Sequence, residues 1–126
     1  MNEARYEILV LDDEEIVGKR LRTALEKSGY AVEIFQDSRE AVARIAEKEF
    51  DIVVTDIRME EIDGMEVLEH VLAQSERTKV IIITGYATVE VAREALTRGA
   101  FDFIAKPFKP EDLREVISRA IVEIKR

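Results

Sequence analysis

The chain contains no cysteine, and only two prolines and five glycines occur among its 126 residues. Without cysteine, disulfide bonds, thiolate metal sites and cysteine nucleophiles are excluded. With so few prolines and glycines, no stretch reads as a linker between domains. No apolar run approaches the ~20 residues needed to cross a bilayer, and the charged N-terminus is unlike a signal peptide. The sequence therefore predicts one soluble domain, residues 1–126, in the cytoplasm.

An excess of acidic residues limits the partners of this domain. Asp and Glu number 27 against 19 Lys and Arg, which gives a formal net charge of −8. Direct binding to nucleic acid or to an acidic membrane needs a basic face, so neither is expected. Hydrophobic residues make up 47% of the chain, which is enough to form a core.

Five short apolar runs alternate with five helical patterns. The runs cover residues 8–11, 31–35, 52–55, 80–83 and 101–105. Several of them are apolar throughout, which is typical of parallel strands that helices cover on both faces. Strands and helices that alternate at this short spacing form right-handed βαβ units. The predicted fold is α/β, a (βα)5 doubly wound five-stranded parallel sheet.

Polar side chains collect where these apolar runs end. Asp12 and Asp13 follow the first run, Asp56 the third, Thr84 the fourth and Lys106 the fifth. The carboxyl ends of parallel strands share one sheet edge, where ligands bind in open α/β sheets. The flavodoxin-like strand order 2-1-3-4-5 would bring the three aspartates together, although the residues alone do not determine that order.

Three carboxylates in one crevice repel each other unless a cation lies among them. Only oxygen ligands are present, so a hard ion such as Mg²⁺ is expected, with waters completing its octahedral shell. Lys106 adds a positive charge and Thr84 a hydroxyl donor. A carboxylate nucleophile, a divalent ion, a lysine and a hydroxyl together suit phosphoryl transfer.

In this arrangement the sequence resembles the receiver domains of bacterial two-component response regulators. The resemblance extends from Glu7 to Ile124. The segments that carry it are Leu11–Glu14, Thr55–Met59, Asp63–Glu66, Ile83–Ala87 and Gly99–Phe108. The last two look like receivers that feed sigma-54-type transcription activators.

The resemblance assigns roles to individual residues. Asp56 would be the phosphoacceptor, with Thr84 and Lys106 contacting the phosphoryl group. Magnesium would be held by Asp12, Asp13, Asp56 and the backbone carbonyl of Arg58. Thr84 and Phe103 would form the conformational switch, and the Lys106–Pro107 peptide bond would be cis.

The resemblance also implies partners and an output. A sensor histidine kinase would supply the phosphoryl group. Phosphorylation would remodel the face made by the fourth helix, fifth strand and fifth helix, where an effector domain or a second copy would dock. The domain would control transcription or a phosphorelay without turning over a substrate, so it would not be an enzyme in the usual sense.

One position departs from the family pattern. The family commonly has proline after Met59, and this chain has Glu60 followed by Glu61. The loop loses a fixed φ angle and gains two negative charges close to the expected metal. Metal affinity and the lifetime of the phosphorylated state are therefore open.

Other functions remain as alternatives. A magnesium-dependent phosphatase of the haloacid dehalogenase type also uses an aspartate nucleophile, but it needs an Asp-x-Asp motif after the first strand and usually has a cap insertion. A flavodoxin-like nucleotide binder needs a phosphate-binding loop where Asp12 to Gly18 is acidic. Asp12 to Glu15 alone would more simply be acids favoured at a helix N-terminus.

Overall fold

The computed structural model describes residues 5–57 and 62–125, in which strands and helices alternate. The strands are β1 (Glu7–Leu11), β2 (Ala31–Phe35), β3 (Ile52–Asp56), β4 (Lys79–Thr84) and β5 (Asp102–Ala105). The helices are α1 (Glu15–Lys27), α2 (Ser38–Glu47), α3 (Gly64–Gln74), α4 (Val89–Thr97) and α5 (Pro110–Lys125). Each predicted strand and helix is present, and Asp56 is the last residue of β3.

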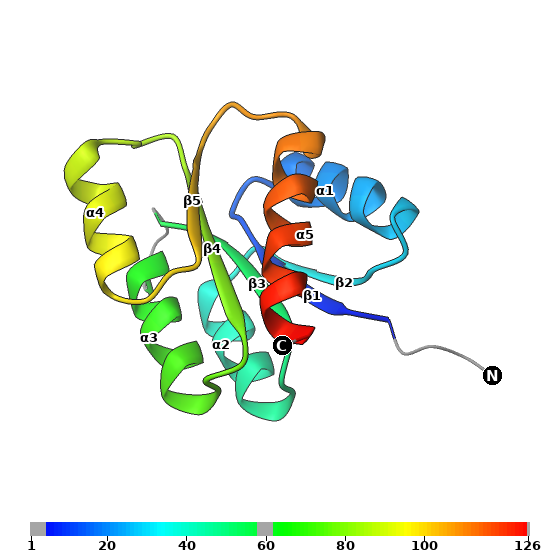
Figure 1. Cartoon of the computed structure of the whole chain (residues 1–126), viewed down its shortest axis with the longest axis horizontal. Coiled ribbons are helices and arrows are strands. Elements are labelled where there is room, and N and C mark those ends of the chain that lie inside the picture. The colour runs from blue at the N-terminus through cyan, green and yellow to red at the C-terminus, as the bar shows by residue number, and fades with distance from the viewer. Residues whose placement is uncertain (1–4, 58–61, 126) are drawn as a thin grey trace.

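The strands form one parallel sheet in the order β2-β1-β3-β4-β5 (Figure 1). Because β1 lies between β2 and β3, Ile8 has Val32 as its partner on one side and Ile52 on the other. The predicted order is confirmed, and it places the ends of β1 and β3 next to each other.

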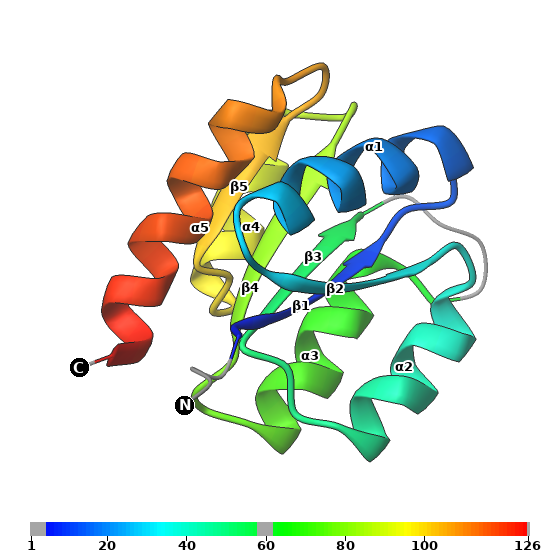
Figure 2. The ribbon, with the colours of Figure 1, turned by 90° about the vertical axis from the view of Figure 1, so that its right-hand side faces the viewer.

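Helices cover both faces of the sheet, so successive strand residues point into two different cores. Ile8 and Val10 pack with α1 and α5, whereas Leu9 and Leu11 pack with α2, α3 and α4. Figure 2 shows α1 and α5 on one side of the sheet and α2 and α3 on the other. Burial on both faces explains why the strands are apolar throughout.

Side chains fix several of the helix starts. Asp37 accepts hydrogen bonds from the backbone N–H groups of Arg39 and Glu40 at the start of α2. Asp63 and Glu66 form a complete capping box at the start of α3, which satisfies N–H groups that would otherwise lack a partner. Among the helices described here, none is long and apolar enough to cross a membrane.

Candidate functional site: an acidic crevice at the carboxyl edge of the sheet

Three aspartates meet where β1 and β3 end. Asp12 and Asp56 are buried, with 1% and 6% of their surface exposed, and Asp13 is exposed. One carboxylate oxygen from each lies within 4.8 Å of the others. The structure therefore brings together Asp12, Asp13 and Asp56, as the positions at strand ends predict.

Lys106 reaches into this crevice from the end of β5. Its Nζ lies 2.8 Å from Oδ2 of Asp56 and 2.7 Å from Oδ2 of Asp12. The backbone N–H of Lys106 donates to the carbonyl of Thr84, at 2.8 Å, so β4 holds the base of the side chain. The Lys106–Pro107 peptide bond is cis.

The surroundings shift the pKa values of two of these groups. Burial alone would lower the pKa of Lys106, but the adjacent carboxylates of Asp12, Asp56 and Glu14 outweigh it and raise that pKa above its ordinary value. Burial raises the pKa of Asp12, and the Lys106 ammonium and the backbone N–H of Glu14 offset only part of this effect. Lys106 is therefore a permanent cation near neutral pH.

Thr84 ends β4 at the same edge. Its side chain is fully buried, and its hydroxyl oxygen accepts a hydrogen bond from the backbone N–H of Tyr86, at 3.0 Å. Phe103, on the neighbouring strand β5, is partly buried against the core beneath α2, α3 and α4. The two predicted switch residues thus lie on adjacent strands, and Thr84 joins the sheet edge to the turn that leads into α4.

Gly64 lets α3 start directly against the end of β3. A Cβ atom at this position would lie 2.3 Å from the carbonyl oxygen of Asp56 and 2.7 Å from the Cα of Ile57. Contacts this close are not tolerated, so a side chain here would push α3 away from Asp56. Glycine at position 64 therefore allows the start of α3 to pack directly against the backbone of Asp56, and this packing fixes the position of the Asp56 carboxylate.

The crevice has the chemistry of a hard-cation site. Oδ2 of Asp12 is buried and accepts no hydrogen bond from any described residue; its 2.7 Å contact with Lys106 has the distance of an ion pair without the angles of a hydrogen bond. An unsatisfied buried carboxylate oxygen beside two further carboxylates fits a divalent cation. The residues present therefore fit Mg²⁺. Arg58, predicted to add a carbonyl ligand, lies outside the described residues, as do Glu60 and Glu61.

Glu14 is a member of the site that the sequence analysis did not identify. Its carboxylate accepts a hydrogen bond from Nζ of Lys106, at 3.1 Å. The sequence offered only a run of acids before a helix, which is also the common pattern of helix N-termini. No spacing rule connects residues 92 positions apart, so this contact could be found only in three dimensions.

The chain is similar to known signalling proteins. A family model described as "Response regulator receiver domain" matches residues 8–118. "Regulatory protein AtoC" of Escherichia coli is 40% identical over 114 residues, which cover 90% of this chain and 25% of that protein. "Transcriptional regulatory protein ZraR" of Salmonella typhimurium is 35% identical over 96% of this chain and 27% of its own length.

A solved structure shows the same fold. The beryllofluoride-activated NtrC4 receiver domain dimer has a TM-score of 0.88 and 35% identity, with 94% of this chain and 98% of that chain covered. This chain spans about a quarter of the length of the two curated relatives. What those relatives do through their remaining length is therefore not established for this chain.

Proposed function

The chain belongs to the family of response regulator receiver domains, and from this premise we propose that Asp56 is the residue that is phosphorylated. Receiver domains are phosphoacceptor switches in signalling and are generally not metabolic enzymes. The family match gives no support to the alternative of a haloacid dehalogenase-type phosphatase. One observation carries the assignment: Asp56 is the buried carboxylate at the end of β3 that both contacts Lys106 and lies among two further carboxylates.

In the proposed reaction, a carboxylate oxygen of Asp56 forms a bond to the phosphorus of the donor. The bond between that phosphorus and the donor's leaving group breaks, and the leaving group keeps the electron pair. Asp12, Asp13 and Asp56 would hold Mg²⁺, with the carbonyl of Arg58 as a further ligand. The ion, when bound, neutralises negative charge on the phosphoryl oxygens.

Lys106 and Thr84 complete the site. The ammonium of Lys106, now against Asp56, would contact a phosphoryl oxygen once Asp56 is esterified. The hydroxyl of Thr84 would donate a hydrogen bond to the phosphoryl group. The hydroxyl oxygen accepts from the backbone N–H of Tyr86, and its hydrogen is still available to donate. Rotation of the side chain toward the phosphoryl group would break the contact with Tyr86, and this movement would carry the signal toward Phe103 and α4.

Partners and output are part of the proposal and rest on the family and its relatives. A sensor histidine kinase would be the donor. The name of ZraR and the sigma-54-type resemblance of the sequence favour control of transcription through an effector domain, and the NtrC4 dimer favours a second copy as a docking partner. The cytoplasmic location expected from the sequence rests on the family alone.

Labelling with a small phosphodonor such as acetyl phosphate tests the assignment. Wild type should gain one phosphoryl group only when Mg²⁺ is present, and Asp56→Asn should gain none. Asp37→Asn is a matched control because asparagine caps a helix as well as aspartate does, so α2 should persist and labelling should be unchanged. Magnesium-dependent labelling that persists in Asp56→Asn would falsify the proposal.

A further inference from the structure

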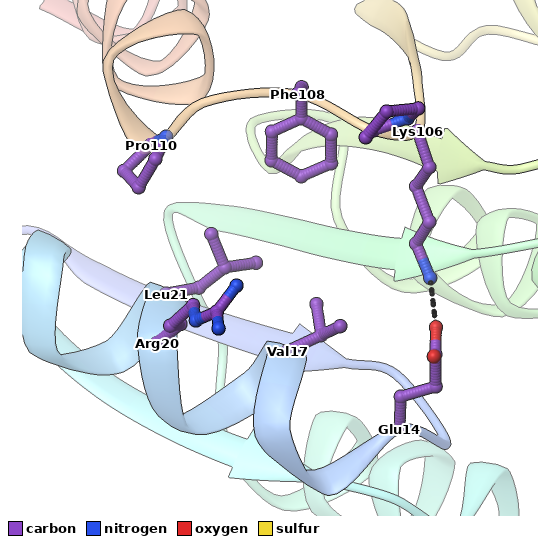
Figure 3. Close-up of a pocket in the computed structure, with 8 residues that line it drawn as sticks. Glu14, Val17, Arg20, Leu21, Lys106, Phe108 and Pro110 are labelled. Carbon is purple, nitrogen blue, oxygen red and sulfur yellow. Dashed lines mark hydrogen bonds and ion pairs between the residues drawn. The ribbon is translucent and has the colours of Figure 1, made fainter.

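Glu14 occupies the N-cap position of α1, but its side chain makes no capping hydrogen bond. Short side chains such as Ser, Asp and Asn are preferred at this position because they reach back to the first-turn N–H groups. Glu14 instead extends to Lys106, and their carboxylate and ammonium groups meet at 3.1 Å (Figure 3). The residue gives up local helix stabilisation and makes a long-range contact with the site.

The three carboxylates on Lys106 differ in their surroundings. Asp12 and Asp56 are buried and belong to the group that could hold a metal ion. The Glu14 side chain is 60% exposed and, with Lys106, lines a pocket of about 400 Å³ between α1 and the segment after β5. Figure 3 shows the Glu14–Lys106 pair at one side of this pocket, away from Phe108 and Pro110.

We propose that Glu14 is a positioning residue that holds the ammonium group of Lys106 beside Asp56 when a divalent cation occupies the crevice. This inference rests on the proposed function. A cation among the aspartates repels the ammonium and competes with it for the oxygens of Asp12 and Asp56. Glu14 supplies Lys106 with a carboxylate outside that group, which lowers the cost of having both cations in the crevice.

Removal of this carboxylate should therefore weaken magnesium binding. In Glu14→Gln, Lys106 is left to pair with Asp12 and Asp56 alone and competes more strongly with the metal. The magnesium concentration at half-saturation should rise about two- to fivefold, the range expected for one partly exposed ion pair. Amide chemical shifts in a magnesium titration measure this affinity without any phosphoryl transfer.

Glu15→Gln is the matched control. It removes a neighbouring negative charge that is paired with Lys19 rather than Lys106. Any change in magnesium affinity in this variant therefore measures the loss of one negative charge near the crevice. In a Lys106→Gln background, Glu14→Gln should change magnesium affinity no more than Glu15→Gln does.

Glu14→Asn should raise the metal-free melting temperature, because asparagine is a better N-cap, while it still weakens magnesium binding. A purely structural role would move both quantities in the same direction.

The outcomes separate this inference from the proposed function. If wild type binds no magnesium, the proposed function fails. If wild type binds magnesium and Glu14→Gln behaves like Glu15→Gln, or if the effect of Glu14→Gln persists without Lys106, only the role of Glu14 is overturned. A larger effect of Glu14→Gln that disappears with Lys106 supports it.

Discussion

Asp13 differs from Asp12 and Asp56 because its side chain is exposed and the ammonium of Lys106 lies against the other two carboxylates. The crevice keeps a like-charge repulsion that Lys106 offsets only in part. Two like charges ~4–5 Å apart cost roughly 1–4 kcal/mol at effective dielectric constants between water and a protein surface. Such an arrangement is unfavourable for folding and favourable for binding a cation.

Asp13→Asn should therefore stabilise the protein when no metal is present. We expect the melting temperature in chelator to rise by roughly 2–5 °C, and the further rise in millimolar magnesium to shrink, since a ligand stabilises only the state that binds it. Glu123→Gln, which removes an exposed charge near the end of α5, controls for the change in net charge. An Asp13→Asn protein that melts below wild type in chelator would contradict a cation site.

Which site residues the sequence could reveal depends on whether they end a strand. Asp12, Asp13, Asp56, Thr84 and Lys106 were predictable because a parallel sheet brings the ends of its strands to one edge. The orientation of Thr84 was not, because a single hydroxyl can serve a turn or a ligand, and here it accepts from Tyr86.

Helix α2 is tied to the edge strand β2 by a two-pronged ion pair. Nε and Nη2 of Arg44 lie 2.9 and 3.0 Å from the two carboxylate oxygens of Glu33, and Lys48 approaches the same carboxylate at 3.6 Å. The hydrogen bonds from Arg44 hold the pKa of Glu33 below its ordinary value. Charge on β2 also discourages pairing of this edge with another chain.

The contribution of Glu33 to stability should depend on pH. A carboxyl group with a depressed pKa in the folded state stabilises it above the unfolded value of ~4.3 and loses this effect as the pH falls through the folded value. Glu33→Gln should lower the free energy of unfolding by less than about 1 kcal/mol near pH 7, because the pair is partly exposed. The difference from wild type should disappear once the pH falls below the depressed folded-state pKa of Glu33.

Urea denaturation at several pH values measures this difference. The control is Glu26→Gln, which breaks an exposed pair with Arg22 within one helix and should change stability little at any pH. A Glu33→Gln deficit that stays constant down to the lowest pH would show that packing, and not charge, fixes α2 to β2.

The helices and strands were easier to predict from the sequence than the ion pairs that join them at the surface. Runs such as Ile81–Ile83 are fully buried, and burial on both faces leaves little choice but an apolar strand. Capping spacings such as Asp37 to Glu40 act within one turn of chain, so they too are visible in sequence. The Glu33–Arg44 ion pair joins two partly exposed side chains of different elements. Charged residues at such positions follow no sequence pattern that would indicate their partners.

Helix α4, on the α4–β5–α5 side of the molecule, has fewer buried residues than any other described helix. Ala95 is the one buried residue of α4, while Val89 and Leu96 on this helix are 68% and 47% exposed, and Val122 on α5 is 53% exposed. A helix with few buried contacts can shift at low cost. Because only residues 85–88 separate Thr84 from α4 and β5 carries Phe103, a change at the proposed phosphoryl site has a short path to this surface.

Occupation of Asp56 by a phosphoryl mimic such as beryllofluoride should therefore alter amide chemical shifts along Ala87–Gly99 as well as around the crevice. If a second copy docks on the changed surface, the sedimentation coefficient should rise with the mimic. Leu96→Ser should prevent that rise and leave acetyl phosphate labelling of Asp56 intact. Ile16→Ser, which removes a large apolar side chain of α1 that is 62% exposed, should affect neither. Chemical-shift changes confined to the loops around Asp56 would mean that α4 is not the surface that changes on phosphorylation. A partner can respond to the switch only through a surface that differs between the two states.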